Sequence, residues 1–249
     1  AVTENSIDKA MLLIDVGANV ESPDNIGWTP LMIAVNEHNK NMVSMLIKAG
    51  ANVNAQETSG LTPLHLIARF SCHSESDHED IINLLLEAGA DLNIKTEEGA
   101  TPVFLSASNG SLKAMELLLN AGADVEEPDN KGWTPLLCAV EYKKEAIVSA
   151  LLKAGANAEV KTEQGWTPLM LMVIEEKESM VNALLNGGAD VDATDDEGLT
   201  PLMWAESKAI VEALINAGAN VEAQNSYGWT PLLSMIMDST GWEHDKNDI

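Results

Sequence analysis

The chain has 249 residues, of which 45% are hydrophobic and only 4% aromatic, a composition that suffices for a core and favours helices. Acidic residues outnumber Lys and Arg by 39 to 14, for a net charge of −25, and Arg69 is the only arginine. Such a chain repels polyanions, which excludes nucleic-acid binding and binding to an anionic membrane surface. We expect a protein partner with a basic segment; alternatively, the acid only keeps an exposed chain in solution.

Two sequence markers recur along the chain with the same spacing. The Thr-Pro pairs are separated by 33, 39, 33, 33, 33 and 30 residues, and the Gly-Ala pairs repeat the same intervals. A period near 33 predicts a solenoid of stacked helical units. The Thr-Pro pairs begin at Thr29, Thr62, Thr101, Thr134, Thr167, Thr200 and Thr230, and the Gly-Ala pairs at Gly17, Gly50, Gly89, Gly122, Gly155, Gly188 and Gly218.

In chain order, residues 6–16 match only the second helix of a unit, and residues 27–55 show the first complete one. Thr29 is a good helix N-cap, and Pro30 suits the first helical position because it needs no N–H there. A short helix, a polar connection and a second apolar helix follow, until Gly50 provides a C-cap. Neither helix is long enough to be stable alone, so each must pack on its neighbours.

The unit resembles the ankyrin repeat, whose signature Thr-Pro-Leu-His-x-Ala stands almost unchanged in Thr62 to Ala68. His65 is the only retained signature histidine, and the resemblance implies that it is structural. The resemblance implies an all-α solenoid of helix-turn-helix pairs with short β-hairpin or turn fingers. It covers one domain, 1–249, of about seven units with a partial repeat at 1–23 and a truncated last unit. The units start near residues 24, 57, 96, 129, 162, 195 and 225, and the last of these is the truncated one.

The ends and the irregular units carry their own expectations. No polar cap is evident, so we expect the parent protein to continue and self-association through the uncapped ends to be possible. Repeat 2 has six extra residues within 69–80, the last unit has an extension at 238–246, and repeat 6 is three residues short. Both extensions should lie between the two helices of a unit. The first one contains Cys72, His73 and His78, which form either a solvated loop or a metal site.

No residues form a catalytic constellation, a phosphate-binding loop or a cofactor site, so we expect no enzyme activity, cofactor or metal. The two cysteines lie far apart, which favours a reducing, cytoplasmic compartment. No apolar run is long enough to cross a bilayer, and no signal peptide is visible.

The residue before each Thr-Pro is Trp in four of seven units. In the ankyrin fold this position lies at the base of the fingers, on the concave side that binds partners. Each indole alone could simply pack on the next finger, but the stripe as a group favours a binding surface suited to cations. The tryptophans are Trp28, Trp133, Trp166 and Trp229, with Trp204 one turn further along its unit.

The fingers are the nine residues before each stripe position, and they hold 18 of the 39 acids but only three lysines. An acidic, tryptophan-lined groove suits Lys and Arg side chains. The densest acids, which we predict to bind the partner, are Glu126, Glu127, Asp129, Asp195, Asp196 and Glu197.

One alternative is a methyl-lysine reader, because some ankyrin domains of histone methyltransferases resemble Gly132-Trp133-Thr134-Pro135 with Glu141. Cys138 replaces the second tryptophan of that pattern, although Trp204 occupies a cage-like position one unit away. Two further alternatives remain: a regulatory or targeting region of a larger enzyme, channel or bacterial effector, and a structural spacer. The sequence favours a protein-interaction scaffold.

Overall fold

The computed structural model describes residues 4–70 and 75–239, and this part of the chain contains fourteen helices and no strand. The chain divides into two compact units, unit 1 (Ala1–Cys138) and unit 2 (Ala139–Ile249). We call the helices that follow Thr-Pro inner helices and those that precede Gly-Ala outer helices. The prediction of an all-α solenoid of helix pairs is confirmed.

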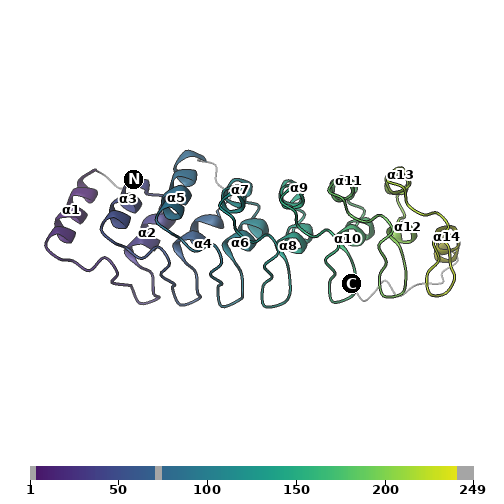
Figure 1. Ribbon diagram of the computed structural model, residues 1–249, viewed down its shortest axis with the longest axis horizontal. Coiled ribbons are helices and arrows are strands. Elements are labelled where there is room, and N and C mark those ends of the chain that lie inside the picture. Colours follow the sequence, from purple (N-terminus) through teal and green to yellow (C-terminus); the bar gives the residue numbers. More distant parts are fainter. Residues whose placement is uncertain (1–3, 71–74, 240–249) are drawn as a thin grey trace. The chain divides into compact units, whose positions relative to one another are not determined.

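In unit 1 the inner helices α2, α4 and α6 pack side by side, and the outer helices α1, α3, α5 and α7 form a second row (Figure 1). Each outer helix from α3 onward also packs on the inner helix of its own repeat. The bounds are α1 Glu4–Asp15, α2 Pro30–Asn36, α3 Lys40–Lys48, α4 Pro63–Ala68, α5 Glu75–Glu87, α6 Pro102–Asn109 and α7 Leu112–Asn120, and α8 Pro135–Glu141 spans the boundary.

Unit 2 repeats this arrangement, with inner helices α10, α12 and α14 in one row and outer helices α9, α11 and α13 in the other (Figure 1). The bounds are α9 Glu145–Lys153, α10 Pro168–Ile174, α11 Glu178–Asn186, α12 Pro201–Trp204, α13 Lys208–Asn216 and α14 Pro231–Ser239.

The inner helices begin where the sequence predicted. The Thr29 hydroxyl accepts a hydrogen bond from the Met32 amide at 3.3 Å, and Pro30 occupies the first turn. The same cap recurs at Thr62, Thr101, Thr134, Thr167 and Thr230. The outer helices end before a left-handed glycine, such as Gly50 with φ of 90°, where any other residue would be strained.

The core lies between the two rows of helices. Leu31 and Met32 on α2 are fully buried, as are Val43 on α3 and Leu85 on α5. Small residues, such as the buried Ala68, let neighbouring helices approach closely. Because each helix is short, this packing against neighbours supplies most of its stability.

The irregular repeats differ in part from expectation. The extra residues of repeat 2 do not all form a connection, because α5 begins at Glu75 and the outer helix absorbs several of them. In repeat 6, which is three residues short, the inner helix α12 has only four residues. Its first turn is tight, because the Met203 N–H donates to the Thr200 carbonyl three residues earlier. Of the last extension, residues 240–246 lie outside the described residues, and Ser239 still belongs to α14.

Candidate functional site

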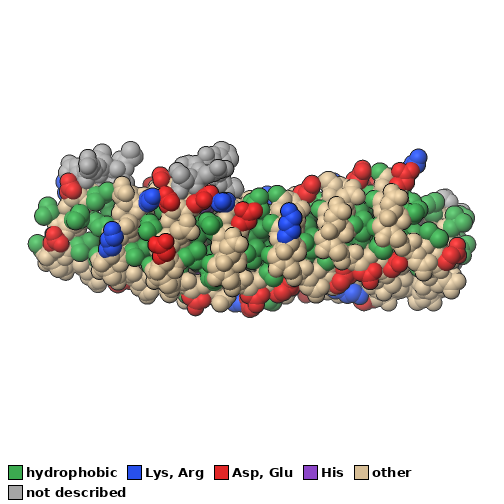
Figure 2. Space-filling model, turned by 45° about the horizontal axis from the view of Figure 1, so that its top comes forward, with side chains coloured by type: hydrophobic (Ala, Val, Ile, Leu, Met, Phe, Trp, Pro, Cys, Tyr) green, Lys and Arg blue, Asp and Glu red, His purple; other side chains and the backbone are tan. Residues whose placement is uncertain are grey.

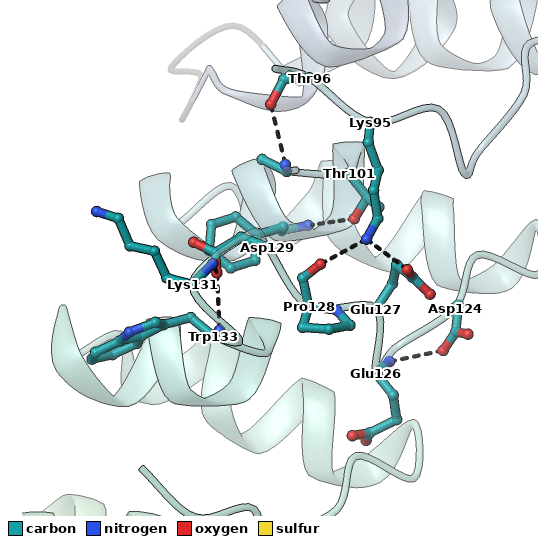
Figure 3. A network of polar contacts seen from close by, with 12 residues as sticks. Lys95, Thr96, Thr101, Asp124, Glu126, Glu127, Pro128, Asp129, Lys131 and Trp133 are labelled. Carbon is teal, nitrogen blue, oxygen red and sulfur yellow. Dashed lines mark hydrogen bonds and ion pairs between the residues drawn. The ribbon is translucent and has the colours of Figure 1, made fainter. Parts of the chain in front are cut away.

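Every finger is a turn closed by the residue that stands four positions before the stripe residue. In unit 1 the Asp129 N–H donates to the Trp133 carbonyl at 3.0 Å, and the Asp129 carboxylate accepts from the Trp133 and Lys131 amides at 2.9 Å each. Figure 3 shows these bonds around Asp129. The carboxylate at this position therefore holds the finger in shape, so Asp129 is tied into its own turn.

The finger acids have a second structural use, which was not predicted from the sequence. The side chain eight residues before the threonine accepts a backbone N–H from the next repeat: Glu21 from Asn52 at 2.8 Å, and Glu159 from Asp190 at 2.8 Å. Asn54 and Asp192 make the same bond to Asp91 and Asn220. The signal was present, because this position is a hydrogen-bond acceptor in every repeat: Glu21, Asn54, Asn93, Glu126, Glu159, Asp192 and Glu222.

Glu127, predicted to contact a partner, pairs with a lysine of the preceding finger. Its carboxylate lies 2.7 Å from the Lys95 amine, which also donates to the Pro128 carbonyl at 2.9 Å (Figure 3). This ion pair links two fingers of unit 1 and neutralises part of the predicted acidic surface.

In unit 2 the structure brings three predicted site residues together. The rings of Trp166 and Trp204 meet edge to face, with centroids 6.3 Å apart and planes at 71°. The Trp204 indole N–H donates to Asp195 at 3.2 Å, while the other Asp195 oxygen accepts from the Leu199 amide at 2.8 Å. We call Trp166, Trp204 and Asp195 the tryptophan corner. Asp195 was predicted to bind the partner, but it is only 7% exposed. Its carboxylate therefore supports the corner and is not open to solvent.

The other stripe tryptophans are also half-buried. Trp133 packs on a small core cluster that includes Phe104 and Cys138. The Trp229 ring lies 5.6 Å from that of Tyr227. Trp28 is likewise half-buried, at the base of the first finger. Each of these indoles therefore has a structural role and keeps part of its surface exposed.

The predicted acids that remain at the surface are Asp196, Glu197 and Glu141, all exposed, and Glu126, which is half-buried. Asp196 lies against Gly165, the residue before Trp166, which places an exposed carboxylate beside the tryptophan corner. In Figure 2, acidic side chains are visible at both the upper and the lower edges of the view and outnumber Lys and Arg.

His65 is structural, as the sequence predicted. Its Nδ1 lies 2.8 Å from the Thr62 hydroxyl and accepts from the Thr62 amide at 3.2 Å, so Nε2 carries the proton and donates to the Ala100 carbonyl at 3.1 Å. Burial lowers the pKa of His65 to about 4, because the charged ring would lose its water. The neutral imidazole thus joins two successive repeats.

The alternative metal site on the repeat 2 insert finds no support among the residues described. Cys72 and His73 lie outside the described residues, while His78 stacks on His38 at 5.6 Å. Burial, together with His38, lowers the pKa of His78 to about 4. Within residues 4–70 and 75–239, no group of three His, Cys, Asp or Glu side chains could hold a metal ion.

No described helix has the length and apolar character needed to cross a membrane.

A family model described as ankyrin repeats (3 copies) matches residues 1–96, 70–162 and 154–225. The chain therefore belongs to the ankyrin repeat family. Among solved structures, the chain is similar to the crystal structure of the ankyrin repeat domain of Bcl-3, described as a unique member of the IkappaB protein family. The TM-score is 0.73 at 29% identity, over 84% of this chain and 94% of the other.

No curated protein matches the chain. In contrast, 583 chains of solved structures match it, so the likeness of fold does not single out one partner. Ankyrin repeat domains are typically protein–protein interaction modules and are typically non-catalytic.

Proposed function

We propose that this ankyrin domain is a scaffold that binds a basic segment of another protein, and that the tryptophan corner of unit 2 is the centre of the site. The observation that carries the proposal is the perpendicular pair of half-buried indoles, Trp166 and Trp204, with the Asp195 carboxylate bonded to one of them. A cation that lies between two rings set at an angle is attracted by both of them, whereas a single exposed ring offers one contact.

The charges around the corner support the same partner. The bond from the Trp204 indole to the buried Asp195 carboxylate makes that ring more electron-rich, which strengthens its attraction for a cation. The exposed Asp196 and Glu197 stand on the same finger and attract a Lys or Arg from a distance. Trp229 and Glu141 of unit 2, and separately Trp28, Trp133 and Glu126 of unit 1, are further residues that we propose to contact a partner.

The test is a pull-down from source-cell lysate at low and high salt, with the partner then assayed against the purified chain. We expect Asp196→Lys with Glu197→Lys, and separately Trp166→Ala, to weaken binding at least about tenfold. High salt should weaken the wild-type complex, because exposed charges are screened beyond roughly 10 Å at 0.1 M salt.

A matched control carries the same change of charge on the outer helices. Glu87→Lys with Glu116→Lys alters two exposed acids on α5 and α7, away from every finger. Equal loss of binding in both double variants would indicate a general effect of net charge and contradict a site at the corner. Binding that no variant and no salt concentration changes would indicate a site outside the acidic fingers, and capture of no partner at all would favour the spacer.

We further propose a cytoplasmic location, because the chain has only two cysteines, which lie far apart in the sequence and form no disulfide framework. Fractionation of source cells tests this, and recovery of the chain outside the cytoplasm would contradict it.

A further inference from the structure

Successive fingers are joined at their tips by a backbone hydrogen bond. The residue directly after the one that closes the turn donates its N–H to a carbonyl of the preceding finger. The bond joins every pair of successive fingers in unit 1 and the last pair in unit 2. The bonded residues are Thr58 and Ile26 at 3.3 Å, Glu97 and Ser59 at 2.9 Å, Asn130 and Glu98 at 3.0 Å, and Ser226 and Glu197 at 3.0 Å.

The fingers at residues 157–165 and 190–198 of unit 2 lack this bond. In the part of the chain that the structure describes, the Asp196 N–H makes no hydrogen bond to the Gln164 carbonyl. The same two fingers are joined elsewhere, because the Lys161 amine donates to the Thr194 carbonyl at 2.8 Å. They are therefore connected along their length but open at their tips.

The residue type at the tip explains the difference. In unit 1 this place holds Asn130, whose side-chain amide donates to the Glu97 carbonyl at 2.8 Å. In unit 2 it holds Asp196, and a carboxylate has no N–H to donate to a carbonyl. The Asp196 carboxylate lies instead over Gly165, with one oxygen 2.6 Å from the place of an added Cβ. The tips of these fingers are therefore rich in acceptors and short of donors.

This open tip adjoins the tryptophan corner. Gly165 directly precedes Trp166, and Asp196 directly follows Asp195, which accepts from the Trp204 indole. Asp196 and Gln164 are both exposed, and among the described residues no hydrogen bond reaches the Gln164 carbonyl. Two aromatic rings, a carboxylate and a backbone carbonyl therefore stand next to one another without a donor to match the acceptors.

We propose that the cation bound at the tryptophan corner is an arginine of the partner, which supplies these donors. The inference rests on the proposed function, since it names the side chain that the corner binds. A guanidinium group has flat faces that stack on an indole and N–H groups all along its edge. It can contact a ring and still donate to the Asp196 carboxylate and the Gln164 carbonyl.

Lysine and its methylated form fit the same place less well. An ammonium group has N–H donors but no flat face, so donating to both acceptors turns it away from the rings. Trimethylated lysine is attracted by the rings but has no N–H at all, and it would leave the acceptors unpaired. The expected order of affinity is arginine, then lysine, then trimethylated lysine.

The experiment titrates the full 249-residue chain with short Gly-Ser peptides that carry one central arginine, lysine or trimethylated lysine. Shifts of the Trp166 and Trp204 indole N–H signals in NMR spectra report binding. The arginine peptide should bind at least about tenfold more tightly than the trimethylated one, with lysine between them. In the free chain the Asp196 N–H should exchange with solvent faster than the bonded Asn130 N–H.

Asp196→Asn tests the cause, because it supplies the donor that Asn130 supplies in unit 1. The preference for arginine over trimethylated lysine should fall to about twofold or less. The matched control is Glu178→Gln, which makes the same change of charge at an exposed acid on the outer helix α11 and should keep the preference.

Two results would overturn the inference: equal binding of the arginine and trimethyl-lysine peptides, or a preference that survives Asp196→Asn. If no peptide binds, although capture of the partner still depends on Trp166, the inference fails and the proposed function stands. Capture that Trp166→Ala does not weaken would contradict the proposed function itself.

Discussion

Unit 1 and unit 2 contain the same repeat but depart from it in different ways. Unit 1 gains residues in repeat 2 and lengthens an outer helix, α5, while its inner helices keep their caps. Unit 2 loses residues in repeat 6 and shortens an inner helix, α12, whose Thr200 hydroxyl is buried without a hydrogen-bond partner. In both units the finger turn is unchanged, because its bonds lie within a few residues.

The two units also use their polar groups differently. Unit 1 connects successive repeats through His65 and the Lys95–Glu127 ion pair. In the described part of unit 2 there is no histidine, and the buried Asp195 carboxylate accepts from the Trp204 indole, whose ring meets that of Trp166. Both units therefore connect their repeats through polar groups, and the tryptophan corner that we propose as a binding site lies in unit 2.

The largest expected difference concerns the finger glycines. Gly99 in unit 1 has φ of 84°, and a Cβ there would lie 2.6 Å from the Asn130 backbone nitrogen, which cannot move away. Gly165 in unit 2 has φ of 79°, but the atoms nearest to its Cβ would belong to the Asp196 side chain, which can rotate. We expect Gly99→Ala to cost about 4 kcal/mol and Gly165→Ala about 2 kcal/mol in urea unfolding.

Gly122→Ala is the control for this pair, because Gly122 has φ of 93° and nothing within 4 Å of an added Cβ. It should cost only the strain of the backbone, about 1–2 kcal/mol. Equal costs at Gly99 and Gly122 would show that the contact between fingers is unimportant.

The second difference is the response to pH. The pKa of His65 is about 4 in the folded chain, below its ordinary value of 6.5, so the unfolded chain binds a proton first as the pH falls. The neutral His65 ring therefore contributes its full share of the folding free energy above pH 6.5. This contribution, on the order of 3 kcal/mol, should be lost as the pH falls from 6.5 to 4. Hydrogen exchange at pH 7 and 4.5 should show more opening around α4 and α6 than around α10 and α12.

His65→Leu tests the cause. It removes the titrating group and leaves the Ala100 carbonyl without this donor, so the variant should be less stable at pH 7 but lose less on acidification. His78, whose pKa is also about 4, should account for part of the remaining pH dependence. A variant with the full wild-type pH dependence would contradict the assignment.

The third difference lies in the acids that close the fingers. Asp195→Asn can keep the turn through its amide oxygen but places an amide N–H₂ against the Trp204 indole N–H, which should cost about 1.5 kcal/mol. Asp129→Asn in unit 1 makes the same change where no indole is bonded, and should cost less than about 0.5 kcal/mol. Urea unfolding with tryptophan fluorescence measures both, and equal costs would argue against a role for the indole bond.

The smallest difference concerns the helix caps. Thr29→Val in unit 1 removes a hydroxyl that caps α2 and should cost about 1 kcal/mol. Thr200→Val in unit 2 removes a buried hydroxyl that has no partner, so stability should stay the same or rise slightly. A clear loss of stability from Thr200→Val in thermal unfolding would mean that this hydroxyl is bonded after all.

Several features could be predicted from the sequence because they depend on neighbouring residues. Thr29, Pro30 and Gly50 determine where helices begin and end through contacts of a few residues, and their recurrence determines the repeat. The structural role of His65 was also predicted, although its bond to Ala100, 35 residues away, was not.

The candidate site could be predicted only in outline. The sequence located the tryptophans and acids, but it treated all finger acids alike as available to a partner. Asp129, Glu127 and Asp195 proved to be bonded within or between fingers, whereas Asp196 stayed exposed beside Trp166.

Sequence alone therefore determined the repeat, its register and its excess of acid, since these are local or additive properties. Only the tertiary structure decided which carboxylates accept hydrogen bonds from other repeats. The N–H groups that donate to Glu21 and Asp192 lie 31 and 28 residues away in the sequence.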